Sequence, residues 1–231
     1  MISSDILLPI DREIQINQSV KFNVKLSQNR TIEYINHNFC EVSGYEEFDF
    51  IGETISDFGH PDMPKSIFDL IFTRIANKQP VKALIKFIAK DGRYFWILAF
   101  FIPKLDANGA LISYYLQGTS VSQYSRFKVK NLYLILRKIE EKTGNTKASL
   151  RYLIGYLEDR NISYDQFIED ISTTQTQAGS QQIQPTKEVG LDNLTQKQEN
   201  NLNTQQTGFL HSNALLKQPK KKTSLFKRIF G

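Results

Sequence analysis

The residues best suited to chemistry are a histidine and three aspartates, and their positions favour structural roles. His60 lies in the run GHPDMP (59–64) just ahead of a helical pattern, where a histidine more often caps or packs than binds a ligand. Asp57, Asp62 and Asp91 stand at turn or capping positions and need no acid–base role. The sequence contains no GxxxxGKS/T, HExxH or GxSxG motif and no Cys/His spacing typical of a metal site. We therefore predict that the protein is not an enzyme.

The single cysteine and the absence of long apolar runs indicate the cellular compartment. Cys40 has no partner for an intramolecular disulfide, so we expect it to fill space as a small hydrophobe. No window approaches the roughly 18 apolar residues that span a membrane, and the first residues lack the layout of a signal peptide. These features predict a cytoplasmic protein in a reducing compartment.

The net charge of +5 is concentrated at the carboxyl terminus. The last fifteen residues contain six lysines or arginines and no acid, so residues 1–216 carry a charge of −1. A nucleic-acid-binding domain would normally spread its basic residues over a folded surface. We therefore expect no nucleic acid as a partner, although a nucleic-acid-binding regulator remains an alternative.

Alternation of apolar and polar residues predicts strands within residues 20–121, and Asp91-Gly92 is typical of a hairpin turn. The strands are expected at residues 20–26, 31–35, 81–90, 93–102 and 111–117. Between the second and third of them, helical spacing predicts an amphipathic helix through Phe68, Ile71, Phe72 and Ile75. Two strands, then helices, then a three-strand meander indicate an α+β fold, an antiparallel sheet with its helices on one side.

Residues 124–171 change to a helical period and form a predicted helical extension. One apolar stripe precedes a break at Gly144-Asn145, a second follows it, and a third helix is expected from Ser163, which forms a capping box with Gln166. Residues 172–219 are then poor in apolar side chains, since 15 of the 46 residues from Thr173 to Gln218 are Asn or Gln. Such a segment is predicted to be a disordered linker.

Three sequence runs resemble PAS sensory domains, specifically those of bacterial aerotaxis receptors. They are YINHNFCEVSGY (34–45), GHPDMP (59–64) and KDGRYFW (90–96), and the similarity covers roughly residues 11–121. The helical segment also resembles an extension of small sensors from split energy-taxis systems, which work beside a separate transmembrane chemoreceptor. The resemblance implies a five-stranded PAS fold and, in the best-known members, a bound FAD whose redox state is the signal.

The resemblance also implies a cofactor site, from which this sequence departs at several positions. His60 matches a family position linked to FAD, but Gly59 stands where the family typically has arginine. Phe72 replaces a family tryptophan, and Phe87 replaces a pocket asparagine. Strand parity places Ile85 and Phe87 on the inward face, where Phe87 offers no hydrogen bond and fills space. The expected cofactor residues are His60, Phe72, Ile85 and Phe87, with FAD or no cofactor as the two alternatives.

The opposite face of the same strand is a candidate surface for a partner or a homodimer. Its residues are Lys82, Leu84, Lys86 and Ile88. Alternatively, the amino-terminal segment 1–19 covers this face through Ile2, Leu7, Leu8 and Ile10, and we favour this cover with part of the surface left for a partner.

Residues 220–231 have the pattern of an interfacial membrane helix. In a helix their apolar side chains gather on one side, and the stretch SLFKRIFG resembles the membrane-targeting tail of the Min-system ATPase. The alternatives are a frayed tail or a peptide that docks into a partner groove. The expected membrane-binding residues are Lys220, Lys221, Lys222, Leu225, Phe226, Lys227, Arg228, Ile229 and Phe230.

Taken together, the patterns predict a cytoplasmic PAS sensor that is peripheral at the inner face of the cell membrane. It would sense a redox state or a small ligand and relay the signal to a chemoreceptor or kinase. The alternative is a cofactor-free PAS scaffold that recruits or dimerises partners.

Overall fold

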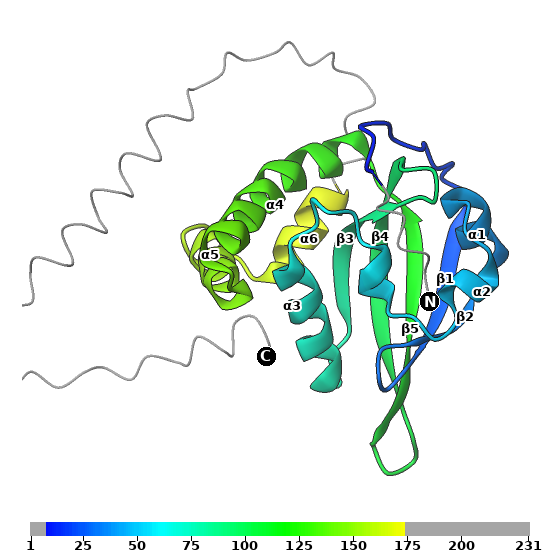
Figure 1. Cartoon of the computed structure of the whole chain (residues 1–231). Helices are drawn as coiled ribbons and strands as arrows, with labels where there is room; N and C mark the ends of the chain where they lie inside the picture. Colours follow the sequence, from blue (N-terminus) through cyan, green and yellow to red (C-terminus); the bar gives the residue numbers. More distant parts are fainter. Residues whose placement is uncertain (1–7, 174–231) are drawn as a thin grey trace, which may run out of the picture. The chain divides into compact units, whose positions relative to one another are not determined.

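The structure is a computed structural model, and it describes residues 8–173 (Figure 1). Most of the predicted linker 172–219 and all of the predicted membrane helix 220–231 lie outside the described residues, as do residues 1–7 of the predicted cap. Within 8–173, no helix is both long enough and apolar enough to cross a membrane.

A five-stranded antiparallel sheet forms the centre of the fold, as the sequence predicts. Its strands are β1 (Lys21–Ser27), β2 (Ile32–Ile35), β3 (Val81–Ile88), β4 (Tyr94–Leu105) and β5 (Leu111–Ser120), in the spatial order β2-β1-β5-β4-β3. The β3–β4 hairpin turns at Gly92, whose φ of 86° favours glycine. A Cβ at Gly92 would also lie 2.5 Å from the carbonyl oxygen of Leu8. This turn therefore requires glycine both for its conformation and for the close approach of the amino-terminal segment.

The inward face of the sheet is covered by the helices between β2 and β3. They are α1 (His37–Ser43), α2 (Glu47–Phe50), the 3-10 helix η1 (Ile55–Phe58) and α3 (Lys65–Ala76). The predicted stripe of α3 is confirmed, since Phe68, Ile71, Phe72 and Ile75 are all buried. Cys40 in α1 is half-buried and packs against this core.

Both edges of the sheet are hydrogen-bonded to other parts of the same chain. Beside β2, the amide of Ile32 donates to Glu53 (2.9 Å), and the amide of Gly52 donates to Ile32 (2.9 Å). Beside β3, Gly59 forms an isolated bridge with Phe87, and the amide of His60 donates to Lys86 (2.9 Å). The segment 59–64 therefore runs along the end of β3.

The helical extension consists of α4 (Gln123–Thr143), α5 (Thr146–Glu158) and α6 (Tyr164–Thr173). Gly144, with a φ of 62°, ends α4 where the sequence predicts a break. The capping box of the third helix is confirmed, because Ser163 and Gln166 exchange hydrogen bonds of 2.8 and 3.2 Å. Helix α6 continues to Thr173, slightly beyond the predicted start of the linker.

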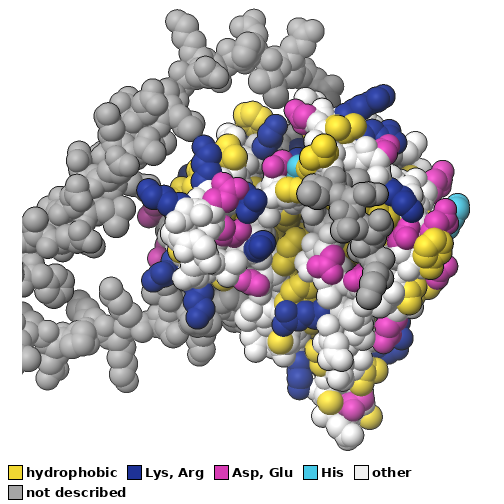
Figure 2. Space-filling model, in the orientation of Figure 1, with side chains coloured by type: hydrophobic (Ala, Val, Ile, Leu, Met, Phe, Trp, Pro, Cys, Tyr) yellow, Lys and Arg dark blue, Asp and Glu magenta, His cyan; other side chains and the backbone are white. Residues whose placement is uncertain are grey.

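The extension wraps around the β3 side of the sheet (Figure 1). Helix α6 lies against β3, and α5 packs on α3. Helix α4 reaches the outward face through Tyr133, whose ring lies 6.1 Å from that of Trp96 and whose hydroxyl donates to Leu84 (2.8 Å). In the space-filling view, basic and acidic side chains lie next to one another on the outer side of this extension (Figure 2).

Candidate functional site

His60 is held in a buried position by the segment 59–64. It is 6% exposed, its Nδ1 accepts the amide of Asp62 (3.1 Å), and its ring meets Tyr94 edge-on at 5.5 Å. Burial and the nearby Lys86 lower the pKa of His60 to about 4. The imidazole is therefore neutral near pH 7. It accepts a hydrogen bond from the chain itself, which fits the predicted structural role.

Phe72 and His60 line one cleft of about 460 Å³ next to α3. The guanidinium of Arg30 lies 4.6 Å from the centre of the Phe72 ring. The cleft also includes Gly59, and a Cβ added there would come within 3.0 Å of the Phe68 ring. The arginine that the resemblance leads us to expect at this position would displace Phe68. The absence of a side chain at Gly59 therefore leaves room for the Phe68 ring.

Ile85 and Phe87 lie apart from this cleft, in the solid core. Both are fully buried, and the Phe87 ring packs 5.3 Å from Phe39 and 5.6 Å from Phe95. Phe22 joins the same group at 5.4 Å from Phe39. The four predicted cofactor residues are therefore divided between a surface cleft and a packed cluster of phenylalanines.

This cluster does not fit the isoalloxazine ring of a flavin. Phe87 offers no hydrogen-bonding group to the polar edge of such a ring, and its side chain occupies the space beside Phe39. A flavin bound among these side chains would have to displace close-packed aromatic rings.

Tyr114 is a core residue that sequence reasoning missed. Its ring lies 6.4 Å from Phe72, and its hydroxyl is buried without a hydrogen-bond partner among residues 8–173. Burial raises the pKa of this phenol above its ordinary value, so the group is neutral. The sequence predicts the strand that carries Tyr114. No sequence signal, however, distinguishes a buried tyrosine whose hydroxyl lacks a hydrogen-bond partner from an ordinary core tyrosine.

Two residues of α4 bind the segment 59–64 and the start of α3, and we call Arg137 and Glu140 the α4 clamp. The Nε of Arg137 donates to the carbonyl oxygen of Pro61 (2.6 Å). The buried carboxylate of Glu140 accepts the amides of Lys65 and Ser66, both at 2.9 Å. These are among the amides that a helix start leaves without intrahelical partners, and a negative charge there is favourable.

A second helix of the extension supports the clamp. The hydroxyl of Ser149 in α5 donates to the same carboxylate of Glu140 (2.9 Å). The clamp was also missed from sequence, although a signal exists: Glu140 follows Leu132 and Leu136 at four-residue intervals, on the buried side of α4. An acid in an apolar stripe indicates a buried polar partner.

The outward face of β3 differs from the predicted partner surface. Lys82 is exposed, but Leu84, Lys86 and Ile88 are buried. The helical extension contributes to this burial, since Tyr133 of α4 bonds to Leu84 and α6 packs on β3, while Lys86 is bonded to Asp62. Three of the four residues are therefore not open to a partner in the described structure.

Of the amino-terminal residues expected to cover this face, Ile2 and Leu7 lie outside the described residues, and Leu8 and Ile10 do not supply the cover. Leu8 and Ile10 are 74% and 44% exposed. The segment instead pairs with the start of β4, where Ile14 donates to Tyr94 (2.7 Å) and Tyr94 donates to Arg12 (3.1 Å). Its role is to extend the sheet locally, because β5 ends before it reaches this part of β4.

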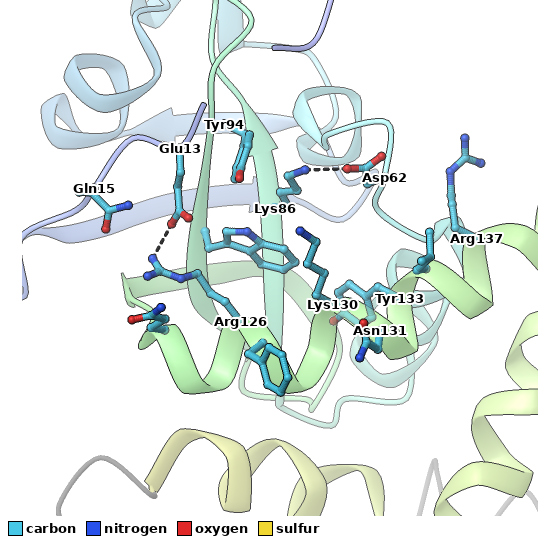
Figure 3. Close-up of a pocket in the computed structure, with 14 residues that line it drawn as sticks. Glu13, Gln15, Asp62, Lys86, Tyr94, Arg126, Lys130, Asn131, Tyr133 and Arg137 are labelled. Carbon is cyan, nitrogen blue, oxygen red and sulfur yellow. Dashed lines mark hydrogen bonds and ion pairs between the residues drawn. The ribbon is translucent and has the colours of Figure 1, made fainter. Parts of the chain in front are cut away.

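Lys86 is the charged residue on the covered face, and it is neutralised locally. Its Nζ lies 2.6 Å from the carboxylate of Asp62 and 3.9 Å from the centre of the Tyr94 ring (Figure 3). Partial burial alone would raise the pKa of Asp62, but the hydrogen bond from Lys86 holds it below its usual value. Asp62 thus links the segment 59–64 to the outward face of β3.

Within residues 8–173, no group of three His, Cys, Asp or Glu side chains is arranged to hold a metal ion. The described geometry offers clefts, a packed aromatic core and hydrogen bonds between the sheet and the extension.

Comparisons with known proteins agree with this architecture. Residues 32–118 match the family described as PAS fold. Over 105 residues the chain is 28% identical to the Aerotaxis receptor of Escherichia coli (strain K12). The aligned stretch covers 46% of this chain and 21% of the relative. The chain thus matches about a fifth of the length of that curated relative.

Similar solved structures include a light-oxygen-voltage domain studied with a flavin analogue (TM-score 0.44, 19% identity, 48% of this chain and 85% of that one). Another is the PAS domain of the fruit-fly ELK potassium channel (TM-score 0.41, 18% identity, 45% and 88%). The match over residues 32–118 identifies this part of the chain, with most of its five-stranded sheet, as a PAS fold, and the chain is similar over 105 residues to a bacterial aerotaxis receptor.

Proposed function

We propose that this protein is a non-enzymatic signal-transduction sensor in which the segment 59–64 passes the state of the PAS domain to the helical extension. The observation that carries the proposal is the α4 clamp. The segment bonds to β3 through His60 on one side and to α4 through Arg137 on the other. A displacement of the segment therefore changes bonds to both elements.

The signal enters through the cleft lined by His60 and Phe72. A small ligand there would move Phe72 or the start of α3, and through the Phe72 ring it would act on Tyr114, whose buried hydroxyl has no partner within residues 8–173. Because Glu140 accepts the first amides of α3, this movement would shift α4 on the outward face of the sheet. A flavin does not fit the phenylalanine cluster, and the route through the cleft does not require one.

The process served is energy taxis, and the partner is a chemoreceptor or kinase at the inner membrane. The similarity to the Aerotaxis receptor supports the process. The sequence pattern of residues 220–231 supports a peripheral position at the cytoplasmic face of the membrane. The anionic membrane surface is therefore the second proposed partner. A homodimer would allow two such tails to bind together.

Gene deletion and complementation test this function. Cells without the gene should swim normally but fail to gather in a gradient of an electron acceptor. The wild-type gene and a Glu158→Gln control, changed at an exposed glutamate at the end of α5, should restore the response. Glu140→Gln, which removes the negative charge of the clamp, should restore it poorly although the protein accumulates. Normal taxis in the deletion strain would refute the function.

The phenylalanine cluster favours a second candidate, a cofactor-free interaction scaffold. A scaffold needs no relayed movement, so Glu140→Gln would complement fully. An absorbance spectrum of the purified chain adds a separate check. We expect no visible flavin bands, and bands that persist through purification would contradict the poor fit of flavin to the core.

A further inference from the structure

Helix α4 has a second apolar side, which faces away from the residues that it packs on the sheet. Phe127 and Leu134 are 67% and 51% exposed, and Tyr124 and Ile135 are exposed as well. Phe127 and Leu134 are seven residues apart, so they lie on the same side of the helix, about 10 Å from each other along its axis. Exposed apolar side chains in such a row indicate a contact surface.

These residues border an elongated cleft of about 560 Å³, which we call the α4 groove. Its lining includes Phe127 and Leu134 on one side, Glu13 on the other, and Trp96 and Tyr133 at its base. The α4 residues that line it extend from Gln123 to Arg137, which is about 20 Å of helix. A groove of this length suits a segment of polypeptide that lies beside α4.

The charges in the groove leave a surplus of positive charge. Arg126 pairs with Glu13, and Lys86 pairs with Asp62 (Figure 3). Lys130 extends from α4 into the groove and makes no ion pair or hydrogen bond within the described part of the chain. Arg137 adds a further positive charge at the end of the groove, where its pair with Glu141 lies on the helix surface.

We propose that the α4 groove binds an acidic amphipathic helix of the signalling partner. Apolar side chains spaced by about two turns would pack against Phe127 and Leu134, and a carboxylate would pair with Lys130. This proposal rests on the proposed function, since it names the surface through which the shifted α4 is detected. The carboxylates of Glu13 and Asp62 inside a concave site make an anionic membrane a poorer occupant than a helix with placed charges.

Trp96 is the single tryptophan of the chain and lies at the base of the groove, so its emission reports binding. The probe is a synthetic helix with leucine on one face and glutamate on the other. Titration of the full chain should give a saturable change in Trp96 emission. A matched helix with lysine in place of glutamate should give none.

Variants identify the site. Lys130→Glu should weaken binding of the glutamate helix by about tenfold, because attraction becomes repulsion, and Phe127→Ser should weaken it through loss of apolar contact. The controls are Lys128→Glu, on the same helix but outside the groove lining, and Phe48→Ser, at an exposed residue of α2. Both controls should bind as the wild type does.

Four outcomes would overturn the proposal. One is the absence of a saturable change with the glutamate helix, and another is equal weakening by Lys128→Glu and Lys130→Glu. The third is a Trp96 change with anionic vesicles that Phe127→Ser abolishes, which would assign the groove to a membrane. If Lys130→Glu and Phe127→Ser restore taxis fully, the groove proposal fails while the proposed function stands.

Discussion

At the scale of single residues, the site is defined by polar groups that the chain has buried at a cost. His60 has its ring between Tyr94 and the segment 59–64, and Tyr114 has a hydroxyl without a partner. A buried neutral histidine and an unpaired phenol each reduce the stability of the fold relative to a well-matched group. His60 lines the cleft and the Tyr114 ring packs near Phe72, which also lines it, so both residues are candidates for signal detection.

The low pKa of His60 predicts a pH dependence of folding. The folded chain has a pKa of about 4 at His60 against the ordinary 6.5, so between these values the unfolded chain binds a proton that the folded chain does not. The contribution of His60 to the free energy of unfolding is complete above pH 6.5. It is lost as the pH falls toward 4, and the total loss is roughly 3 kcal/mol. Between pH 7 and pH 4.5, urea unfolding should show that His60→Gln loses less free energy of unfolding than the wild type does.

His37 provides the matched control for this measurement, because it is an exposed histidine at the start of α1. His37→Gln should keep the wild-type difference between the two pH values. A His60→Gln protein that loses as much stability as wild type would show that the His60 ring takes up its proton in the folded state as readily as in the unfolded one.

The unpaired hydroxyl of Tyr114 predicts an unusual substitution. Tyr114→Phe removes a buried polar atom without changing the ring, so the free energy of unfolding should stay the same or rise by about 1 kcal/mol. Thermal unfolding measures this effect. A loss of more than about 1 kcal/mol would mean that the hydroxyl has a partner in the folded protein and is not available to a ligand.

At the scale of elements, the clamp determines how α3 and α4 are joined. Glu140 lies in a helix of the extension but acts as the cap of a PAS helix, because its carboxylate accepts the amides of Lys65 and Ser66. Pro64, the residue before α3, has no side-chain cap of its own. The start of α3 therefore depends on a residue more than seventy positions away in the sequence.

Removing this carboxylate should destabilise the protein. Glu140→Ala leaves one buried and one part-buried amide without side-chain acceptors, and we expect the free energy of unfolding to fall by about 2–3 kcal/mol. Glu140→Gln keeps one side-chain oxygen and should lose less. Urea unfolding gives both values, with Glu158→Ala as the control that changes stability by less than about 0.5 kcal/mol. Equal effects of Glu140→Ala and Glu158→Ala would refute the capping role.

The sequence predicted elements better than the contacts between them. Alternation placed Phe87 on the inward face and Leu84 and Ile88 on the other, and the structure agrees with both placements. It did not predict that α6 packs on β3 or that Tyr133 of α4 bonds to Leu84, because periodicity shows which residues share a face but not which distant element covers that face. The same limit applies to Glu140, whose partners are amides and carry no side-chain signal.

At the scale of the whole molecule, the PAS domain and the helical extension form one packed unit. Tyr133 bonds to β3, Ser125 in α4 donates to the carbonyl oxygen of Ile171 in α6 (2.6 Å), and Arg74 in α3 pairs with Asp165 (2.6 Å). In these contacts Tyr133, Ser125 and Arg74 are buried. The extension is therefore in a position to respond to the PAS domain as well as to present the α4 groove.

The predicted membrane helix can be tested at this scale. The full chain should sediment with phosphatidylglycerol vesicles and not with phosphatidylcholine vesicles, while a chain ending at residue 216 should remain in the supernatant. Each basic residue near an anionic surface contributes about 1 kcal/mol, and added salt should weaken binding. Competition by DNA at the same concentration of charge would instead favour the nucleic-acid alternative.

The hydrogen bonds along the sides of β2 and β3 also restrict how copies of the protein can assemble. A strand with a free side is a template for another chain, and such additions produce continuous intermolecular sheets. Here Gly52 and Glu53 occupy one margin, and Gly59 and His60 occupy part of the other. Along these occupied stretches a second chain cannot add a strand, which favours self-association through side-chain surfaces, as a closed pair, over an open-ended polymer.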